Sequence, residues 1–380
     1  MIFWKNKGKT EHTPRRMSWG SVFLSLLKIA NILAIIAMAS VGFIDRINPT
    51  EHPLWASIGL GFPVLLAINL AFLVIWIFIR PKMLWLPVLG LLICYSPIRK
   101  YTPFNKPMEH PHGSIKVLSY NVYMFAPWDL EKGKSNPIVD YIINSKADIV
   151  CLQESDAREA GEELIEKRLK DAYPHHDFVK ITDSGGQHMM LLTKFPIIRK
   201  ERIEYKSAGN ISYAYIIDYK GTEVLVVNNH FESNHLSEED KQSYKNIVKS
   251  PLETKDTERA SFRLLNKLGE AAVIRSPQVE KVAAYVKTYM DRHVPVILCG
   301  DFNDSPISFA HHTLEKQLTD CYIASGNGPG ISYHKNGMYF RIDHIFCSDD
   351  FEPFEAKVDD KIDNSDHYPI YTWLKYRPKP

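Results

Sequence analysis

Two long apolar runs near the start of the chain most constrain what it can fold into. The first covers residues 22–44 and the second covers residues 54–79. A helix of about 20 apolar residues is long enough to cross a bilayer. A cleaved signal peptide would have a shorter apolar core, and tryptophans near the ends of both runs favour a bilayer over a soluble core. We therefore interpret both runs as retained transmembrane helices.

A third apolar run, residues 83–98, is shorter and contains Pro87 and Gly90. It could be a third span or a re-entrant segment, and we expect a third span. The membrane region is thus predicted to cover residues 21–98 with two or three helices.

The number of spans decides on which side of the bilayer the rest of the chain lies. The positive-inside rule places the basic N-terminus, residues 1–20, and the pair Arg80 and Lys82 in the cytoplasm. With three spans, the chain after residue 99 lies on the extracytoplasmic side, which is the arrangement that we expect; with two spans it stays in the cytoplasm. Three positive charges after the third run weaken this prediction, namely Arg99, Lys100 and Lys106.

The rest of the chain is predicted to be water-soluble. Residues 99–113 are rich in proline and are predicted to form a linker. Residues 114–380 alternate strand-like and helix-like segments, which predicts one large α/β domain with a two-layered sheet core and helices outside. The predicted strands cover residues 115–122, 147–153, 189–193, 213–219, 223–229, 294–299, 339–347 and 368–375. The predicted helices cover residues 137–145, 157–170 and 277–292, and the polar segment 233–275 is also expected to be helical.

Polar side chains recur where the apolar strands end. Residues 294–299 form an apolar run that is followed by Gly300, Asp301 and Asn303. Because alternate residues of an extended segment share a face, we expect Asp301 and Asn303 to point the same way. Strand ends at one rim of a sheet can converge on a shared cleft. The candidate site residues in chain order are Asn121, Glu154, His230, Asp301, Asn303, Asp343, Asp366 and His367.

Each candidate also has a purely structural interpretation. Glu154 could cap a helix beginning near residue 156, and Asp343 could form a surface ion pair with Arg341. His230 could be an ordinary core histidine, and Asn or Asp residues are common in turns. Their joint occurrence in one order along one chain favours a functional site.

The candidate set is rich in oxygen ligands. Carboxylate and amide oxygens suit Mg²⁺ or Mn²⁺, whereas zinc prefers cysteine or more histidine. The five cysteines form no CxxC pair, and those in apolar runs are interpreted as small buried side chains. A hard cation together with imidazoles and an amide is what hydrolysis of a phosphoester requires.

Six short motifs resemble those of the endonuclease/exonuclease/phosphatase superfamily, which includes deoxyribonucleases, apurinic endonucleases and neutral sphingomyelinases. The resemblance covers residues 114–378 and implies a four-layered α/β sandwich of two packed mixed sheets. The motifs are Ser119-Tyr120-Asn121-Val122, Leu152-Gln153-Glu154, Asn229-His230-Phe231, Gly300-Asp301-Phe302-Asn303, Arg341-Ile342-Asp343-His344-Ile345 and Ser365-Asp366-His367-Tyr368-Pro369.

The resemblance also implies a role for each candidate. Glu154 would be the main ligand of Mg²⁺ or Mn²⁺, assisted by Asn121, and Asp366 would face the metal. Asp301 would orient or deprotonate the attacking water, while Asn303 holds the phosphate. His367, held by Asp343, would contact the phosphoryl oxygens. His230 would stabilise charge or protonate the leaving oxygen.

The substrate is less constrained than the chemistry. Two substrate classes compete, namely nucleic acid and a phospholipid or its head group. The net charge of the chain is only +2, so the field that attracts nucleic acid is weak. Membrane anchoring favours a phosphodiesterase acting at the bilayer, while a nuclease and an inactive binding module remain alternatives. The polar insert 233–275 could form a wall of the cleft, and a monomer is expected.

Overall fold

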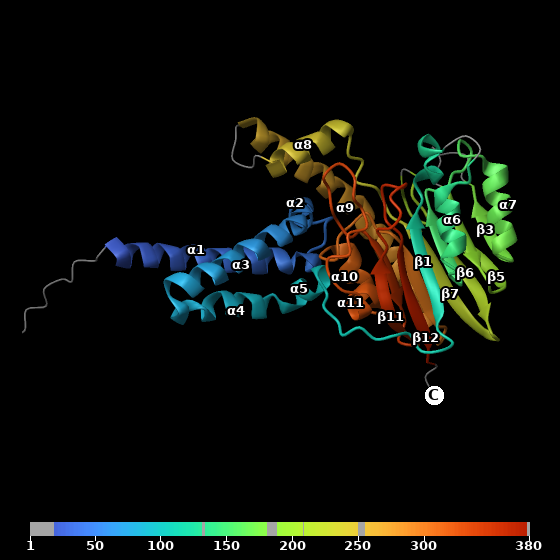
Figure 1. The fold of residues 1–380 in the computed structure, drawn as a ribbon, viewed down its shortest axis with the longest axis horizontal. Helices are drawn as coiled ribbons and strands as arrows, with labels where there is room; N and C mark the ends of the chain where they lie inside the picture. Colours follow the sequence, from blue (N-terminus) through green and yellow to red (C-terminus); the bar gives the residue numbers. More distant parts are fainter. Residues whose placement is uncertain (1–18, 131–133, 181–187, 208, 250–254, 378–380) are drawn as a thin grey trace, which may run out of the picture.

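The computed structural model describes residues 19–130, 134–180, 188–207, 209–249 and 255–377 (Figure 1). The predicted cytoplasmic N-terminus, residues 1–20, lies outside this part of the chain except for Trp19 and Gly20. In chain order, a bundle of apolar helices is followed by a four-layered sandwich, in which two packed sheets lie between outer layers of helices.

Apolar helices account for the first part of the described chain. They are α1 (Trp19–Gly42), α2 (Pro53–Ile58), α3 (Phe62–Ile79), α4 (Trp85–Ile93) and α5 (Tyr95–Tyr101). By length and composition, the stretches Trp19–Arg46 and Pro53–Ile79 can each cross a membrane. The third run is broken, because α4 and α5 meet at an angle of 63°, and only the bent pair together would make a third span.

Two buried asparagines join the long helices. Trp76 of α3 donates its Nε1–H to Oδ1 of Asn31 in α1 at 2.9 Å, and Asn69 donates to the carbonyl of Ala34 at 3.2 Å. Side chains that hydrogen-bond between helices are a common way of holding apolar helices together in lipid. Figure 1 shows α1, α3 and α4 running side by side away from one end of the sandwich.

The soluble part contains two mixed sheets of six strands each. The strand order of the first sheet is β11 (Phe351–Val358), β12 (Ile370–Tyr376), β1 (Ile115–Asn121), β2 (Ile149–Gln153), β4 (Met189–Thr193) and β3 (His175–Val179). The strand order of the second sheet is β5 (Ile197–Ile203), β6 (Ser212–Tyr219), β7 (Thr222–His230), β8 (Val296–Asp301), β10 (Asp343–Cys347) and β9 (Thr319–Asp320). The pairs β1–β2 and β7–β8 are parallel.

Three hydrophobic clusters separate the four layers. Val117 and Cys151 of the first sheet pack against Ile297 and Cys299 of the second. All five cysteines are buried and free, as expected for small apolar side chains. The outer faces of the sheets pack on α6 (Pro137–Asn144) and α7 (Glu162–Ala172) on one side, and on α9 (Lys255–Met290) and α10 (Phe309–Glu315) on the other. The predicted four-layered sandwich is therefore confirmed.

Helix α9 differs from the predicted helix over residues 277–292. It begins at Lys255, inside the polar insert, and continues through Pro277 to Met290. An internal proline costs a helix about 3 kcal/mol or more. Val279, Val282 and Val286 beyond the proline are fully buried against the second sheet, and this packing outweighs the local preference. The insert also contributes α8 (Glu238–Lys249).

Two predicted boundaries also differ. The linker expected over residues 99–113 begins inside helix α5, which continues to Tyr101. The strand expected over residues 339–347 is regular only from Asp343, and Phe340 instead forms an isolated bridge with Tyr333. Arg341 does not pair with Asp343, because its guanidinium donates to the carbonyls of Pro329 and Lys100.

The helix bundle packs directly on the sandwich. Lys100 places its Nζ 2.8 Å from Oδ2 of Asp45, and it also contacts the carboxylate of Glu315 in α10. Ile307 of the soluble part joins the apolar cluster of Met38 and Phe62. The bundle and the sandwich therefore meet at the connection between α1 and α3.

Candidate active site

The site lies where five strands end at one rim of the sandwich. In the second sheet, His230 and Asp301 are register partners at the ends of the parallel strands β7 and β8. Asp343, at the start of antiparallel β10, is also a partner of Asp301. In the first sheet, Asn121 ends β1, and Glu154 directly follows β2. The packing of the two sheets therefore brings residues from both into one cleft.

Gly300 allows the close approach of β7 and β8 at this rim. The strand does not break at this glycine but continues to Asp301. Its φ is +143°, and a Cβ atom there would lie 1.9 Å from the carbonyl oxygen of Asn229. Only glycine fits such a position, since any other side chain would clash with backbone. This contact fixes the position of Asp301.

Asn121 joins two acidic side chains. Its Nδ2 donates to Oε1 of Glu154 at 3.0 Å and to Oδ2 of Asp301 at 3.1 Å. Glu154 does not cap a helix, because α7 begins only at Glu162. The backbone of Glu154 has a φ of +48°, which is uncommon for a residue with a side chain and is often associated with function.

His230 lies beside the same carboxylates. Its Nε2 is 3.8 Å from Oε1 of Glu154 and 3.7 Å from Oδ2 of Asp301. Among the described residues, neither ring nitrogen of this buried histidine has a hydrogen-bond partner. Burial lowers the pKa of His230 and so favours the neutral ring. A buried polar group without a partner is costly, which suits a ring that receives a ligand.

His367 lies beside Asp301 and Asp343 of the same cluster. Its Nδ1 lies 2.7 Å from Oδ2 of Asp343, and its Nε2 lies 3.6 Å from Oδ2 of Asp301. Burial alone would lower the pKa of His367, but the two carboxylates raise it well above its usual value. The two carboxylates therefore favour the charged imidazolium form of the ring, and its Nε2 faces Asp301.

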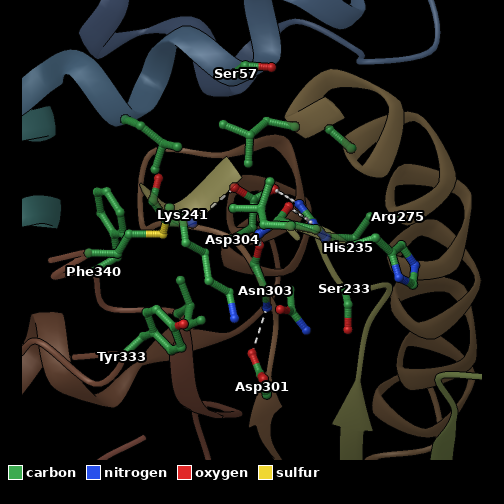
Figure 2. A pocket seen from close by; sticks show the side chains of 18 of the residues that line it. Ser57, Ser233, His235, Lys241, Arg275, Asp301, Asn303, Asp304, Tyr333 and Phe340 are labelled. Carbon is green, nitrogen blue, oxygen red and sulfur yellow. Dashed lines mark hydrogen bonds and ion pairs between the residues drawn. The ribbon is translucent and has the colours of Figure 1, made fainter. Parts of the chain in front are cut away.

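Asn303 and Asp366 line the same cavity. Asn303 does not continue the alternation of β8, because its φ is +52° and its backbone N–H donates to Oδ1 of Asp301 at 2.8 Å. It also donates its Nδ2 to the carbonyl of Phe231 at 3.0 Å. Asp301 and Asn303 thus share the cavity through a turn and not through a strand, and Figure 2 shows them next to each other.

The cluster of carboxylates fits a divalent cation. Burial and the charge of Asp366 raise the pKa of Glu154 to about 7. Ligand atoms of Glu154, His230 and Asp301 lie within 4.8 Å of one another, as do those of Asp301, Asp343 and His367. A hard cation would relieve the repulsion among these oxygens, and the donor set suits Mg²⁺ or Mn²⁺.

The structure brings all eight predicted site residues to one cleft, but it also adds residues that the sequence did not indicate. Ser365 donates its Oγ to the carbonyl of Asn121 at 2.7 Å and so ties the loop of His367 to β1. Its place in the Ser-Asp-His motif was the available signal. Other cavity residues had no such signal, namely Ala56, Leu60, Tyr333 and Arg275.

Fold and site together define a four-layered α/β sandwich with an acidic cleft at its strand ends. The sequence model of the Endonuclease/Exonuclease/phosphatase family matches residues 118–367, and the chain belongs to this family. A second family model, for a domain of unknown function, matches residues 24–101. A comparison with curated proteins gave no match. Family membership supports hydrolysis of a phosphoester by a divalent-metal-dependent enzyme.

Solved structures share the fold at low sequence identity. The human Nocturnin catalytic domain matches with 15% identity and a TM-score of 0.50, over 69% of this chain and 94% of that chain. A truncated TDP2 from Caenorhabditis elegans matches with 15% identity and a TM-score of 0.47, over 69% and 97%. A mannosyl-6-phosphatase from Bacteroides thetaiotaomicron matches with 18% identity and a TM-score of 0.44, over 69% and 100%.

Proposed function

We propose that the protein is a membrane-anchored phosphodiesterase that depends on Mg²⁺ or Mn²⁺. One observation carries this proposal: Oδ2 of Asp301 lies between two histidines, 3.7 Å from Nε2 of His230 and 3.6 Å from Nε2 of His367. A carboxylate between two imidazoles, beside a second carboxylate, offers a base, hydrogen-bond donors and metal ligands within one small space.

The residues divide into a metal side and a phosphate side. Glu154, Asn121 and Asp366 would hold the cation, which when bound neutralises charge on the phosphoryl oxygens. Asp301 would accept the proton of the attacking water, while a new P–O bond forms and the bond to the leaving oxygen breaks.

The histidines and Asn303 would act on the phosphoryl group. The imidazolium of His367, held in one orientation by Asp343, would donate its Nε2–H to a phosphoryl oxygen. The lowered pKa of His230 makes it a neutral hydrogen-bond donor to the developing charge. Asn303 lines the cavity beside Asp301 and would help to position the phosphate.

The test uses the purified full chain in nanodiscs. With Mg²⁺ it should hydrolyse bis(4-nitrophenyl) phosphate faster than 4-nitrophenyl phosphate, because the proposed substrate is a diester. Glu154→Gln and His367→Ala should abolish this activity. Glu163→Gln and His112→Ala, which alter exposed side chains, should leave it unchanged. Activity that persists in both site variants, or faster hydrolysis of the monoester, would contradict the proposal.

The packing of the helices supports a domain on the extracytoplasmic side. Gly42 at the end of α1, Phe62 at the start of α3 and Pro97 in α5 lie together, because a Cβ on Gly42 would be 2.9–3.0 Å from the other two. These three residues lie at the side of the helix bundle that packs on the sandwich. Arg80 follows the opposite end of α3. We propose three passes, with the basic connection at Arg80 and Lys82 in the cytoplasm.

Reporter fusions test this arrangement. A periplasmic-type alkaline phosphatase fused after residue 377 should be active, and one fused after residue 82 should be inactive. Activity at neither position would favour two passes and a cytoplasmic domain, and the opposite pattern would contradict the proposed orientation by inverting the three passes.

A further inference from the structure

The segment that connects the two long apolar helices forms part of the wall of the active-site cavity. The cavity has a volume of about 270 Å³, and Glu154, Asp301 and His367 lie at its floor. Ala56, Ser57 and Leu60 line it from α2 and the turn that follows. Figure 2 shows Ser57 of α2 at one end of the cavity and Asp301 at the other.

This wall is built by close packing of α2 on α9. A Cβ atom on Gly269 of α9 would lie 2.8 Å from the carbonyl oxygen of Pro53, so the two backbones are in contact. Ser57 donates its Oγ to the carbonyl of Leu265 at 2.9 Å. The position of α2 beside the site is therefore fixed by specific contacts with the soluble part.

Several side chains that line the cavity beside this wall are apolar. Leu264, Leu268 and Ala272 of α9 face the cavity, together with Met338 and Phe340 from the loop before β10. The wall is joined directly to the membrane region, because the chain runs from α2 through Gly59–Gly61 into the long apolar helix α3. On the outer side of α2, Leu54 and Trp55 are exposed, which is typical of a helix at the membrane interface.

The few cations of the cavity do not form a track for nucleic acid. The guanidinium of Arg275 pairs with Asp304 at 2.6 Å, and Lys241 pairs with Glu238 at 2.7 Å. A nucleic-acid groove needs several cations that contact successive phosphates. An apolar wall next to a phosphate site instead suits a substrate with a phosphate at one end and an apolar chain at the other.

We propose that residues 53–61 complete the substrate site, and that the substrate is an amphipathic phosphodiester taken from the bilayer. The inference rests on the proposed hydrolase function and adds the substrate class to it. The phosphate reaches Asp301 and His367, while the apolar chain lies along Leu60 and Leu268. The membrane region is then a part of the catalytic unit and not only an anchor.

A series of alkyl 4-nitrophenyl phosphodiesters tests the proposal, because every member releases the same 4-nitrophenolate. The full chain in nanodiscs should show a KM that falls from the methyl through the butyl to the octyl ester, with little change in kcat, as burial of each methylene favours binding. Partition of the longer esters into the nanodisc would also lower KM. The decisive quantity is therefore the octyl-to-methyl ratio of kcat/KM in variants of the wall.

Leu60→Asn and Leu268→Asn should each lower this ratio by about tenfold or more, and Leu60→Met should keep it near the wild-type value. Leu164→Asn is the matched control, since this exposed leucine belongs to α7, on the opposite side of the sandwich. In this variant the partition of the esters into the nanodisc is the same as in the wall variants. Unchanged ratios in both wall variants would overturn the inference. So would a higher kcat/KM for a DNA oligonucleotide than for the octyl ester.

The two proposals fail in different ways. If the wild type hydrolyses none of the esters with Mg²⁺ present, the hydrolase function itself is wrong. If it hydrolyses the methyl and octyl esters with a ratio that the wall does not influence, only the substrate class is wrong.

Discussion

Nδ1 of His367 lies 2.7 Å from Oδ2 of Asp343, and both side chains are buried at the rim of the second sheet. Burial alone would lower the pKa of His367, but Asp343 and Asp301 raise it well above 6.5. A raised folded-state pKa stabilises the fold fully below pH 6.5, and this stabilisation is lost as the pH rises through the raised pKa. The pair therefore couples stability and protonation at the site.

Asp343→Asn should move the alkaline limb of the kcat profile to lower pH, because His367 then loses its proton more easily. We expect kcat at pH 8 to fall by about 10²-fold, the scale of a lost proton donor or acceptor. The loss in unfolding free energy should be largest at pH 6 and should shrink as the pH rises. Activity between pH 5 and 10 and urea unfolding at both ends of this range measure the two effects.

Asp291→Asn provides the control for this experiment, because Asp291 is an exposed aspartate at the end of α9. Asp291→Asn should leave the pH profile of kcat unchanged, including its alkaline limb. A variant at Asp343 with the wild-type alkaline limb would show that the carboxylate does not set the protonation of His367.

Glu154→Gln should stabilise the metal-free protein and destroy its affinity for the cation. In the metal-free protein, burial and Asp366 raise the pKa of Glu154 to about 7, so stability is lost as the pH rises from 4.5 through 7. The neutral amide removes this repulsion, and we expect a gain of roughly 1–3 kcal/mol at pH 8 and none at pH 4.5.

Two measurements check the Glu154 prediction. Thermal unfolding in EDTA at both pH values gives the stability difference, and titration calorimetry with Mn²⁺ gives the affinity, which should fall at least about 10-fold. EDTA should also abolish activity in the wild type, and Mg²⁺ should restore it. A Glu154→Gln protein that binds Mn²⁺ like the wild type would remove this residue from the metal site.

The sequence allowed the fold to be predicted where strands are apolar on both faces. β1, β2 and β8 are buried along nearly their whole length, and each was predicted. β3 and β5 lie at sheet edges and were not predicted, because most residues of β3 are half-buried and most of β5 are exposed. Their sequences therefore show neither an apolar run nor a clean alternation.

The candidate site was predictable for a different reason. Asn121, Glu154, His230 and Asp301 end or directly follow apolar strands, so each stands out against the apolar residues before it, whereas Asp343 and His367 come at the start of β10 and before β12. The wall formed by Leu60 could not be predicted in this way, because it depends on the contact between α2 and α9, which are far apart in the chain. Local patterns show which residues leave a strand, and tertiary packing decides what lies opposite them.

Gly300→Ala should destabilise the protein by more than about 3 kcal/mol, because the new methyl group would overlap the carbonyl of Asn229. The control is Gly221→Ala, which has a φ of +86° but no atom within 4 Å of the added carbon. That variant isolates the backbone cost, which is about 1–2 kcal/mol. Urea unfolding of both variants gives the difference, and equal losses would show that the contact with β7 is relaxed at little cost.

Lys100 should hold the helix bundle on the sandwich through its buried ion pairs. Its Nζ lies 2.8 Å from Oδ2 of Asp45 and also contacts Glu315, with 9% of the lysine side chain exposed. Removing one partner of a buried pair leaves an uncompensated charge and typically costs 3–5 kcal/mol. We therefore expect Lys100→Met to lower the unfolding free energy of the full chain by about this amount.

The double variant Lys100→Met, Asp45→Leu should recover a large part of this loss, because it removes the buried charge together with its partner. Lys82→Met, at an exposed lysine beyond the far end of α3, should have little effect. Thermal unfolding in nanodiscs, followed by tryptophan fluorescence, compares the three variants. Since Asp45 lies in the same connection as α2, Lys100→Met should also lower the octyl-to-methyl ratio of kcat/KM. If Lys100→Met has the same stability and the same octyl-to-methyl ratio of kcat/KM as Lys82→Met, these ion pairs do not hold the connection against the active site.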